Sequence, residues 1–91
     1  MNLTLGQVVY SKAGRDKGKK FIVVDILDEA FVKISDGDLR RIENAKKKKI
    51  KHLENTGEVI LSLSDKLEKK VRVSNSEIRK ALSDKDEANE Q

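Results

Sequence analysis

The sequence predicts a mainly β protein, a small barrel or tight sandwich with a short α-helical C-terminal appendage. Short runs rich in Val and Ile, separated by turn residues, fill residues 1–53. Beyond residue 55, apolar residues recur at a spacing typical of one helix face. The chain has 91 residues, of which 36% are apolar and 40% are charged. These proportions predict one small domain with a small core.

The strands are expected in the first part of the chain. Residues 7–11 form a β-branched run, and residues 21–27, "FIVVDIL", are the strongest strand candidate. Residues 30–35 alternate between apolar and polar side chains, and Asp36-Gly37 indicates a hairpin turn of type I′. The last strands are expected at residues 39–43 and 50–53, on either side of a lysine run. About five short strands bury a common face by curling into a barrel or a tight sandwich.

Helical spacing begins after Asn55. Val59, Leu63 and Leu67 recur at every fourth position, although residues 59–64 can also be read as an alternating strand. In "SNSEIRKAL", a serine and a glutamate three residues later predict a capping box at the start of a second helix. We therefore divide the chain into a β domain at 1–55, a helical segment at 56–83 and a disordered acidic tail at 84–91.

Charge is distributed unevenly along the chain. The net charge is +4, from 20 Lys and Arg against 16 Asp and Glu. Residues 1–53 carry thirteen Lys and Arg against seven Asp and Glu, a net charge of +6, whereas residues 54–91 carry a net charge of −2. A basic surface in the N-terminal part favours a polyanionic partner.

Several functional classes are disfavoured. The chain has no cysteine, so disulfides and thiolate metal sites are excluded. Its N-terminus lacks the features of a signal peptide, and no apolar run approaches the ~20 residues that cross a bilayer. We expect a cytoplasmic protein that does not bind membranes.

The segment "GRDKGKK", residues 14–20, joins glycines and cations next to the strongest strand candidate. It does not fit a nucleotide-binding P-loop, which has four residues between its glycines and a Ser or Thr after the lysine. Here Gly14 and Gly18 enclose three residues, and Lys19 is followed by Lys20. A strand also follows this segment, where a P-loop would lead into a helix.

No catalytic constellation is apparent. His52 is the only histidine, and no arrangement of Ser and Asp near it suggests a triad. The acidic residues at positions 28–29 and 36–38 coincide with turn signals, where Asp is favoured for backbone reasons. We expect no enzyme activity, no small-molecule substrate, no cofactor and no metal.

Two basic clusters remain as candidate binding residues. One surrounds the glycine-containing loop, the other is the run "KKKKIK", and an arginine pair lies between them in the sequence. Each cluster alone is compatible with a solvated loop or with a charged strand edge that prevents aggregation. Together in one small β domain they predict a shared surface that binds phosphates. The candidate residues are Lys12, Arg15, Lys17, Gly18, Lys19, Lys20, Arg40, Arg41, Lys46, Lys47, Lys48, Lys49 and Lys51.

The segment "LGQVVYSKAGRDKGKKFIVVDILDEAFVKISDG" resembles a KOW motif, in which Gly-x-Val-Val precedes a loop ending in Lys-Gly-Lys and a Val/Ile strand. The resemblance covers about residues 5–53, and "GQVVY", "KGKKFIVVDILD" and "DLRRIE" are similar to large-subunit ribosomal proteins of the eukaryotic and archaeal type. The matching residues are Gly6, Val8, Val9, Gly14, Lys17, Gly18, Lys19, Val23, Val24 and Ile26.

This resemblance implies an SH3-like barrel that binds RNA, commonly ribosomal RNA, through the loop between its first two strands. The expected partners are RNA and ribosomal proteins, and the free protein is expected to be a monomer. An alternative stays open: KOW domains of elongation factors of the NusG type contact proteins of the transcription and translation machinery, and RNA contact is then secondary.

Overall fold

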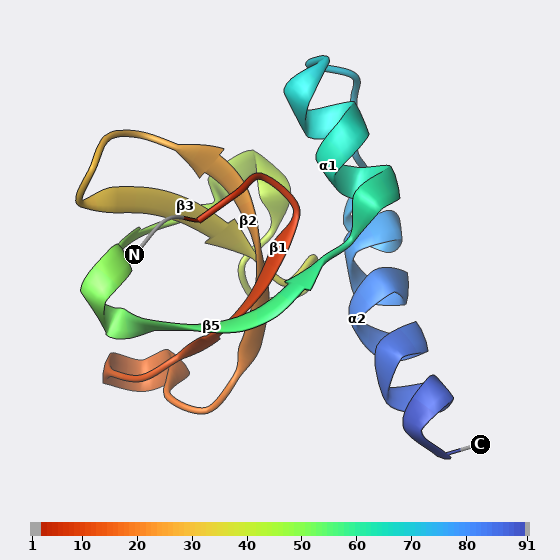
Figure 1. Cartoon of the computed structure of the whole chain (residues 1–91), viewed down its shortest axis with the longest axis horizontal. Coiled ribbons are helices and arrows are strands. Elements are labelled where there is room, and N and C mark those ends of the chain that lie inside the picture. The colour runs from red at the N-terminus through yellow and green to blue at the C-terminus, as the bar shows by residue number, and fades with distance from the viewer. Residues whose placement is uncertain (1–2, 91) are drawn as a thin grey trace.

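A five-stranded antiparallel sheet and two helices make up the computed structural model (Figure 1), which describes residues 3–90 without the side chains of residues 84–90. The strands occupy one side of the molecule in this view and both helices occupy the other. The elements are β1 (Gln7–Ser11), β2 (Lys20–Ile26), β3 (Phe31–Ser35), β4 (Lys46–Lys49), β5 (Leu53–Val59), α1 (Leu61–Glu68) and α2 (Asn75–Glu90), with 3₁₀ turns η1 (Gly14–Asp16), η2 (Ile42–Asn44) and η3 (Ile50–His52).

The sheet has the order β4-β3-β2-β1-β5. Its register shifts between Gln7 and Val9 where β1 pairs with β5, and between Val23 and Asp25 where β2 pairs with β3. Such irregularities increase the bend and twist of a sheet. The mainly β class is confirmed, but the expected closed barrel is not formed, because β4 and β5 stay as the two edges of the sheet.

The strand expected at residues 39–43 is wrong. Their backbone is used in a tight turn, since Asp36 and Gly37 both donate their N–H groups to the carbonyl of Arg40 at 3.0 and 3.3 Å. Asp36 is outside the positive φ region and Gly37 has a φ of 75°, so the expected type I′ hairpin is also absent. η2 follows this turn, where the Asn75 side chain accepts the N–H of Ile42 at 2.7 Å.

The lysine run is itself a strand, β4, and the strand expected at residues 50–53 is instead η3 followed by the start of β5. Lysine has low strand propensity, which hid β4 from the sequence reading. Lysine is nevertheless common on edge strands, where its charge opposes pairing with another chain. β4 is such an edge, paired with β3 only.

Both faces of the sheet are buried. Val9 packs with Phe21, Val23 and Ile34 in one apolar cluster, on the side around which the strands curl. Val8, the preceding residue, points to the other face and packs with Ile22 of β2. There the helices complete a second cluster, formed by Val8, Ile22, Leu63, Val73 and Ile78.

Two helices form as predicted, but α1 begins at Leu61, and Val59, which was expected on its apolar face, is the last residue of β5. Residues 61–68 are helical, which decides against the alternative strand. At the start of α2 the Ser74 hydroxyl accepts the N–H of Glu77 at 3.1 Å, and the Glu77 carboxylate accepts the N–H of Ser74 at 2.9 Å. This reciprocal pair is the expected capping box.

The division after residue 55 falls within β5. The independent folding of residues 1–55 stays a prediction, against the observation that helix side chains share a cluster with Val8 and Ile22. α2 continues to Glu90 in the structure. The acidic tail expected at 84–91 also stays a prediction, because the side chains of residues 84–90 and the whole of Gln91 lie outside the described residues.

The contribution of the helices to the core can be measured at Ile78, which is fully buried. We expect Ile78→Ala to lower the free energy of unfolding by about 2–5 kcal/mol, through lost apolar burial and the cavity left behind. Leu61→Ala is the control, because Leu61 is 77% exposed and the change should stay within about 0.5 kcal/mol. Urea titration followed by circular dichroism gives both values, and a small loss for Ile78→Ala would show that α2 is an appendage.

Candidate functional site

The loop between β1 and β2 is closed by backbone hydrogen bonds. Ser11 donates its N–H to the carbonyl of Lys19 at 3.0 Å, and Gly18 donates to the carbonyl of Ser11 at 2.8 Å. Gly18 has a φ of 85°, and a Cβ at this position would meet no other atom within 4 Å. Glycine is therefore favoured here by its backbone conformation, and the backbone at the end of the loop is open to solvent.

A buried ion pair fixes the same loop. Asp16 in η1 is 4% exposed, and its Oδ2 accepts hydrogen bonds from Nε and Nη2 of Arg40 at 3.1 and 3.0 Å. A carboxylate buried without a cation would be costly, so Arg40 is needed to hold η1 against the turn that follows β3. This pairing gives Arg40 a structural role, and its contact with RNA stays a prediction.

The lysine run meets this loop. Lys48 donates its Nζ to the carbonyl of Ala13 at 3.1 Å, and the N–H of Lys12 donates to the carbonyl of His52 at 2.8 Å. Two segments whose contacting residues are 35 and 40 positions apart in the sequence thus lie side by side. The two basic clusters expected to share a surface are brought together by these contacts.

Strand alternation divides the lysines of β4 between two faces. Lys46 and Lys48 are opposite Ile34 and Val32, whose side chains belong to the inner cluster, whereas Lys47 and Lys49 alternate to the outer face. Lys47 places its Nζ 4.5 Å from the centre of the Phe31 ring, in a cation–π contact. The run therefore does not present all its charges in one direction.

Phe31 lies in a cavity that the sequence reading missed. Its ring, partly exposed, lines an open cavity together with three lysines and one acidic residue: Lys12, Lys49, Lys51 and Glu29. An aromatic ring beside several cations is suited to a nucleobase and its phosphates. The sequence places Phe31 at the start of a predicted strand. Only the register between β3 and β4 shows that Phe31 lies beside lysines.

We group these residues under the name loop–strand surface, in which Lys46 and Lys48 lie on the inner face of β4 and Lys47 and Lys49 on its outer face. It combines the exposed cations of the β1–β2 loop with those of β4 and η3. Lys20 begins β2 and is partly buried. The members of the surface are Lys12, Arg15, Lys17, Gly18, Lys19, Lys46, Lys47, Lys48, Lys49 and Lys51.

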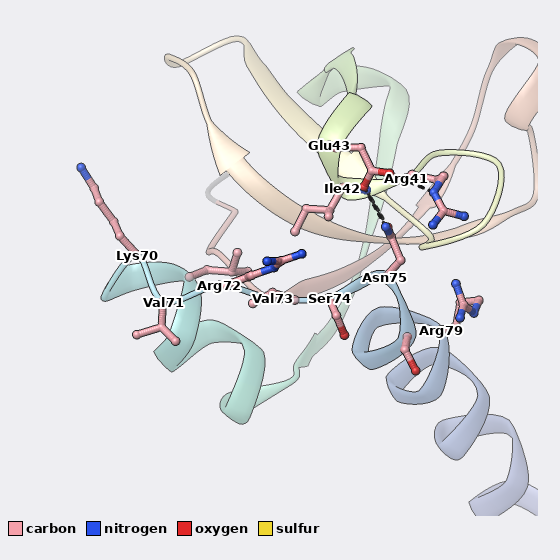
Figure 2. A pocket seen from close by; sticks show the side chains of 12 residues that line it. Arg41, Ile42, Glu43, Lys70, Val71, Arg72, Val73, Ser74, Asn75 and Arg79 are labelled. Atoms are coloured by element: carbon pink, nitrogen blue, oxygen red, sulfur yellow. Dashed lines mark hydrogen bonds and ion pairs between the residues drawn. The ribbon is translucent and has the colours of Figure 1, made fainter.

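Arg41 lies away from this surface, beside the start of α2 (Figure 2). Its Nε donates to Glu43 at 3.0 Å, and the Asn75 side chain donates to the other carboxylate oxygen at 2.7 Å. These hydrogen bonds, with Asn75 contributing most and one from the backbone of Glu43 itself, hold the pKa of Glu43 at about 2, below its usual 4.5. Glu43 is therefore a carboxylate at neutral pH.

Other chemistry finds little support in the described part of the chain. Among residues 3–83, whose side chains the structure describes, no group of three or more His, Asp or Glu side chains is placed to hold a metal ion. In the same range, no helix is both long and apolar enough to traverse a bilayer. His52 is partly buried in η3.

The chain is similar to a protein of the large ribosomal subunit. It is 36% identical over 58 residues to large ribosomal subunit protein eL14 of Desulfurococcus amylolyticus. The match covers 64% of this chain and 60% of that relative, so the chain spans about three fifths of the relative's length. No protein-family model matches the sequence.

This similarity supports a ribosomal-protein-like relationship, in agreement with the resemblance read from the sequence. The KOW motif itself, the RNA contacts and their residues stay predictions.

The structural role of Arg40 can be tested by a double-mutant cycle with Asp16. We expect Arg40→Gln to lower the free energy of unfolding by about 1–3 kcal/mol, because the buried carboxylate loses its charged donors. Adding Asp16→Asn should recover part of this loss, which gives a coupling energy measurable by urea titration. Arg15→Gln, a change in the exposed part of the same loop, should stay within about 0.5 kcal/mol. Additive losses from Arg40 and Asp16 would contradict the pairing.

Proposed function

We propose that the protein binds structured RNA, with ribosomal RNA as the first candidate, and acts as a ribosome-associated protein without enzyme activity. The observation that carries this proposal is the contact between the β1–β2 loop and β4, made by Lys48 and Ala13. It joins two basic segments into one loop–strand surface. The similarity to a large-subunit ribosomal protein supports the choice of ribosomal RNA as the ligand.

The recognition we propose depends on charge and shape. Lysine acts as a point charge on phosphates and carries no base selectivity, so the lysines of the loop–strand surface would position the protein on the RNA backbone. Because the loop is closed by hydrogen bonds and held by Asp16, its backbone would lose little conformational freedom on binding. Phe31 offers the stacking surface for an unpaired base.

Salt dependence gives the first test. If about five cations of the loop–strand surface reach phosphates, the slope of log Kd against log salt should have a magnitude of roughly 3.5–4.5, at ~0.7–0.9 per contact. The double variant Lys17→Gln/Lys19→Gln should lower that magnitude by about 1.4–1.8, as should Lys49→Gln/Lys51→Gln. The ligands are hairpins of ribosomal RNA, and fluorescence anisotropy at several salt concentrations gives the slopes.

Lys69→Gln/Lys80→Gln provides the control, because it removes the same charge from the helical side of the molecule. Equal slopes for the loop variant and this control would contradict the proposal. If the unmodified protein binds no RNA at low salt but co-purifies with ribosomal proteins, the alternative of a protein-interaction module is favoured.

Substitutions at two glycines can show whether RNA binding depends on access to the loop backbone, apart from the effect of backbone strain on stability. Gly18 and Gly57 have nearly equal φ values, 85° and 84°, and a Cβ at either would meet no atom within 4 Å. Gly18→Ala and Gly57→Ala should therefore lower stability by similar amounts, about 1–2 kcal/mol for a residue held in the left-handed region. Only Gly18→Ala is expected to weaken RNA binding, because Gly18 lies in the loop. Equal affinities of the two variants would place the RNA away from the loop backbone.

A further inference from the structure

We propose that the protein has a second phosphate-binding surface on its helical side, so that one molecule can hold two RNA segments. This surface is an open cleft between η2 and the segment that connects α1 to α2. Its volume is about 640 Å³, within the range of ligand pockets. The inference rests on the proposed function for the choice of RNA as the ligand.

The cleft gathers cations that are far apart in the sequence. Arg41 and Arg79 lie at one end of the cleft in Figure 2, Arg72 reaches over its middle and Lys70 lies at the other end. Glu43 is the one acidic residue among those that line it, which leaves a net charge of +3. This concentration is unexpected from the sequence, because residues 54–91 carry a net charge of −2.

Two lysines of α1 that lie outside the cleft are paired with acidic side chains. Lys66 is in an ion pair with Glu77, and Lys69 pairs with Asp65 at 3.2 Å, so two of the acidic charges of α1 and α2 are already matched outside the cleft. Among the described side chains, Lys70 and Arg72 make no ion pair. The cleft therefore keeps positive charge that the protein itself does not neutralise.

Lys70 occupies a backbone position that favours glycine. It has a φ of 60°, the one non-glycine residue with positive φ in the described part of the chain. At the end of α1, its N–H donates to the carbonyl of Leu67 at 3.2 Å, and Val71 donates to the carbonyl of Lys66 at 2.8 Å. This is a Schellman ending, in which glycine is the usual residue with positive φ. A lysine here is strained, and its charge at the cleft gives a physical reason for the strain.

Phosphate is the ligand that we assign to the cleft, in keeping with the RNA of the proposed function. Three of the four cations are arginines, whose planar guanidinium groups can bind phosphate oxygens in pairs. Arg41 already pairs with Glu43, and Nη1 of Arg79 donates to the carbonyl of Gly37, so Lys70 and Arg72 are the cations most available to a ligand. The cleft is also open along its length, so that it can follow an RNA backbone.

The two surfaces lie on different sides of the protein. The loop–strand surface is built on the β1–β2 loop and β4, whereas the cleft belongs to the layer of helices that covers the other face of the sheet (Figure 1). Phosphates bound at the two surfaces would therefore belong to different RNA segments. The protein would act as a bridge between them.

The test is a capture assay with the full chain. A biotinylated ribosomal RNA hairpin is immobilised, the protein is added, and a second hairpin with a fluorescent label is then applied. We expect the unmodified protein to retain the labelled hairpin. The variant Lys70→Gly/Arg72→Gln should still bind the immobilised hairpin. It should retain at least tenfold less of the labelled hairpin than the unmodified protein does.

Stability is measured on the same variants, because a folding defect would also reduce the signal. Lys70→Gly relieves the positive φ, so the urea midpoint of this single variant should be unchanged or higher while capture of the second hairpin falls. Lys69→Gln/Lys80→Gln removes the same charge outside the cleft and should keep full capture.

The outcomes distinguish the two proposals. If the unmodified protein binds the first hairpin but retains no second one, or if the cleft variant captures as well as the control, the second surface is refuted and RNA binding stands. If no hairpin is bound at all, the proposed function is itself refuted. Loss of capture together with a lower urea midpoint for Lys70→Gly would also overturn the inference, since the lysine would then be structural.

Discussion

The fold depends on the burial of both faces of one small sheet. Val8 and Val9 are neighbours on β1, point to opposite faces and are both fully buried. A strand with this pattern cannot leave either face to water, so the sheet must curl on one side and be covered on the other. The curling uses the register shifts between β1 and β5 and between β2 and β3, and the covering uses α1 and α2. The helices therefore cover one of the two buried faces of the sheet.

This constraint explains which parts of the fold the sequence could predict. β1, β2 and β3 are rich in β-branched residues, and the capping box of α2 is a local pattern, so all four were found close to their actual bounds. β4 consists of four lysines, and its strand conformation comes from pairing with β3, which is tertiary information. β5 carries few apolar side chains, so its sequence did not indicate a strand over its full length. The predicted domain boundary was therefore placed within it.

The glycines of the KOW-like pattern have different roles, which the pattern does not distinguish. Gly6 has a positive φ, and a Cβ there would come within 2.8 Å of the Ser64 backbone, so this glycine allows α1 to approach β1. Gly18 faces open space at the end of the loop. One glycine thus serves packing against a helix and the other serves the loop conformation. A sequence match gives both the same weight, and only the environment of each residue separates them.

The candidate cations are divided in a similar way. Sequence reasoning treated Arg40 and Arg41 as one pair, but Arg40 is bound to buried Asp16, whereas Arg41 lies in the cleft beside α2. It also missed Arg72 and Arg79, because they belong to a part of the chain with net negative charge.

Charge summed along a sequence cannot reveal such a cleft. Acidic side chains of α1 and α2 pair locally with Lys66 and Lys69, and among the described side chains Lys70 and Arg72 of the cleft make no ion pair. Arg41 joins the cleft from a distant segment together with its partner Glu43. At physiological salt, the field of an exposed charge is screened within about 8 Å, so the electrostatic character of a surface is set by the charges within that distance. For this protein, the unpaired cations near one another in space matter more for an anionic partner than the net charge of either half of the sequence.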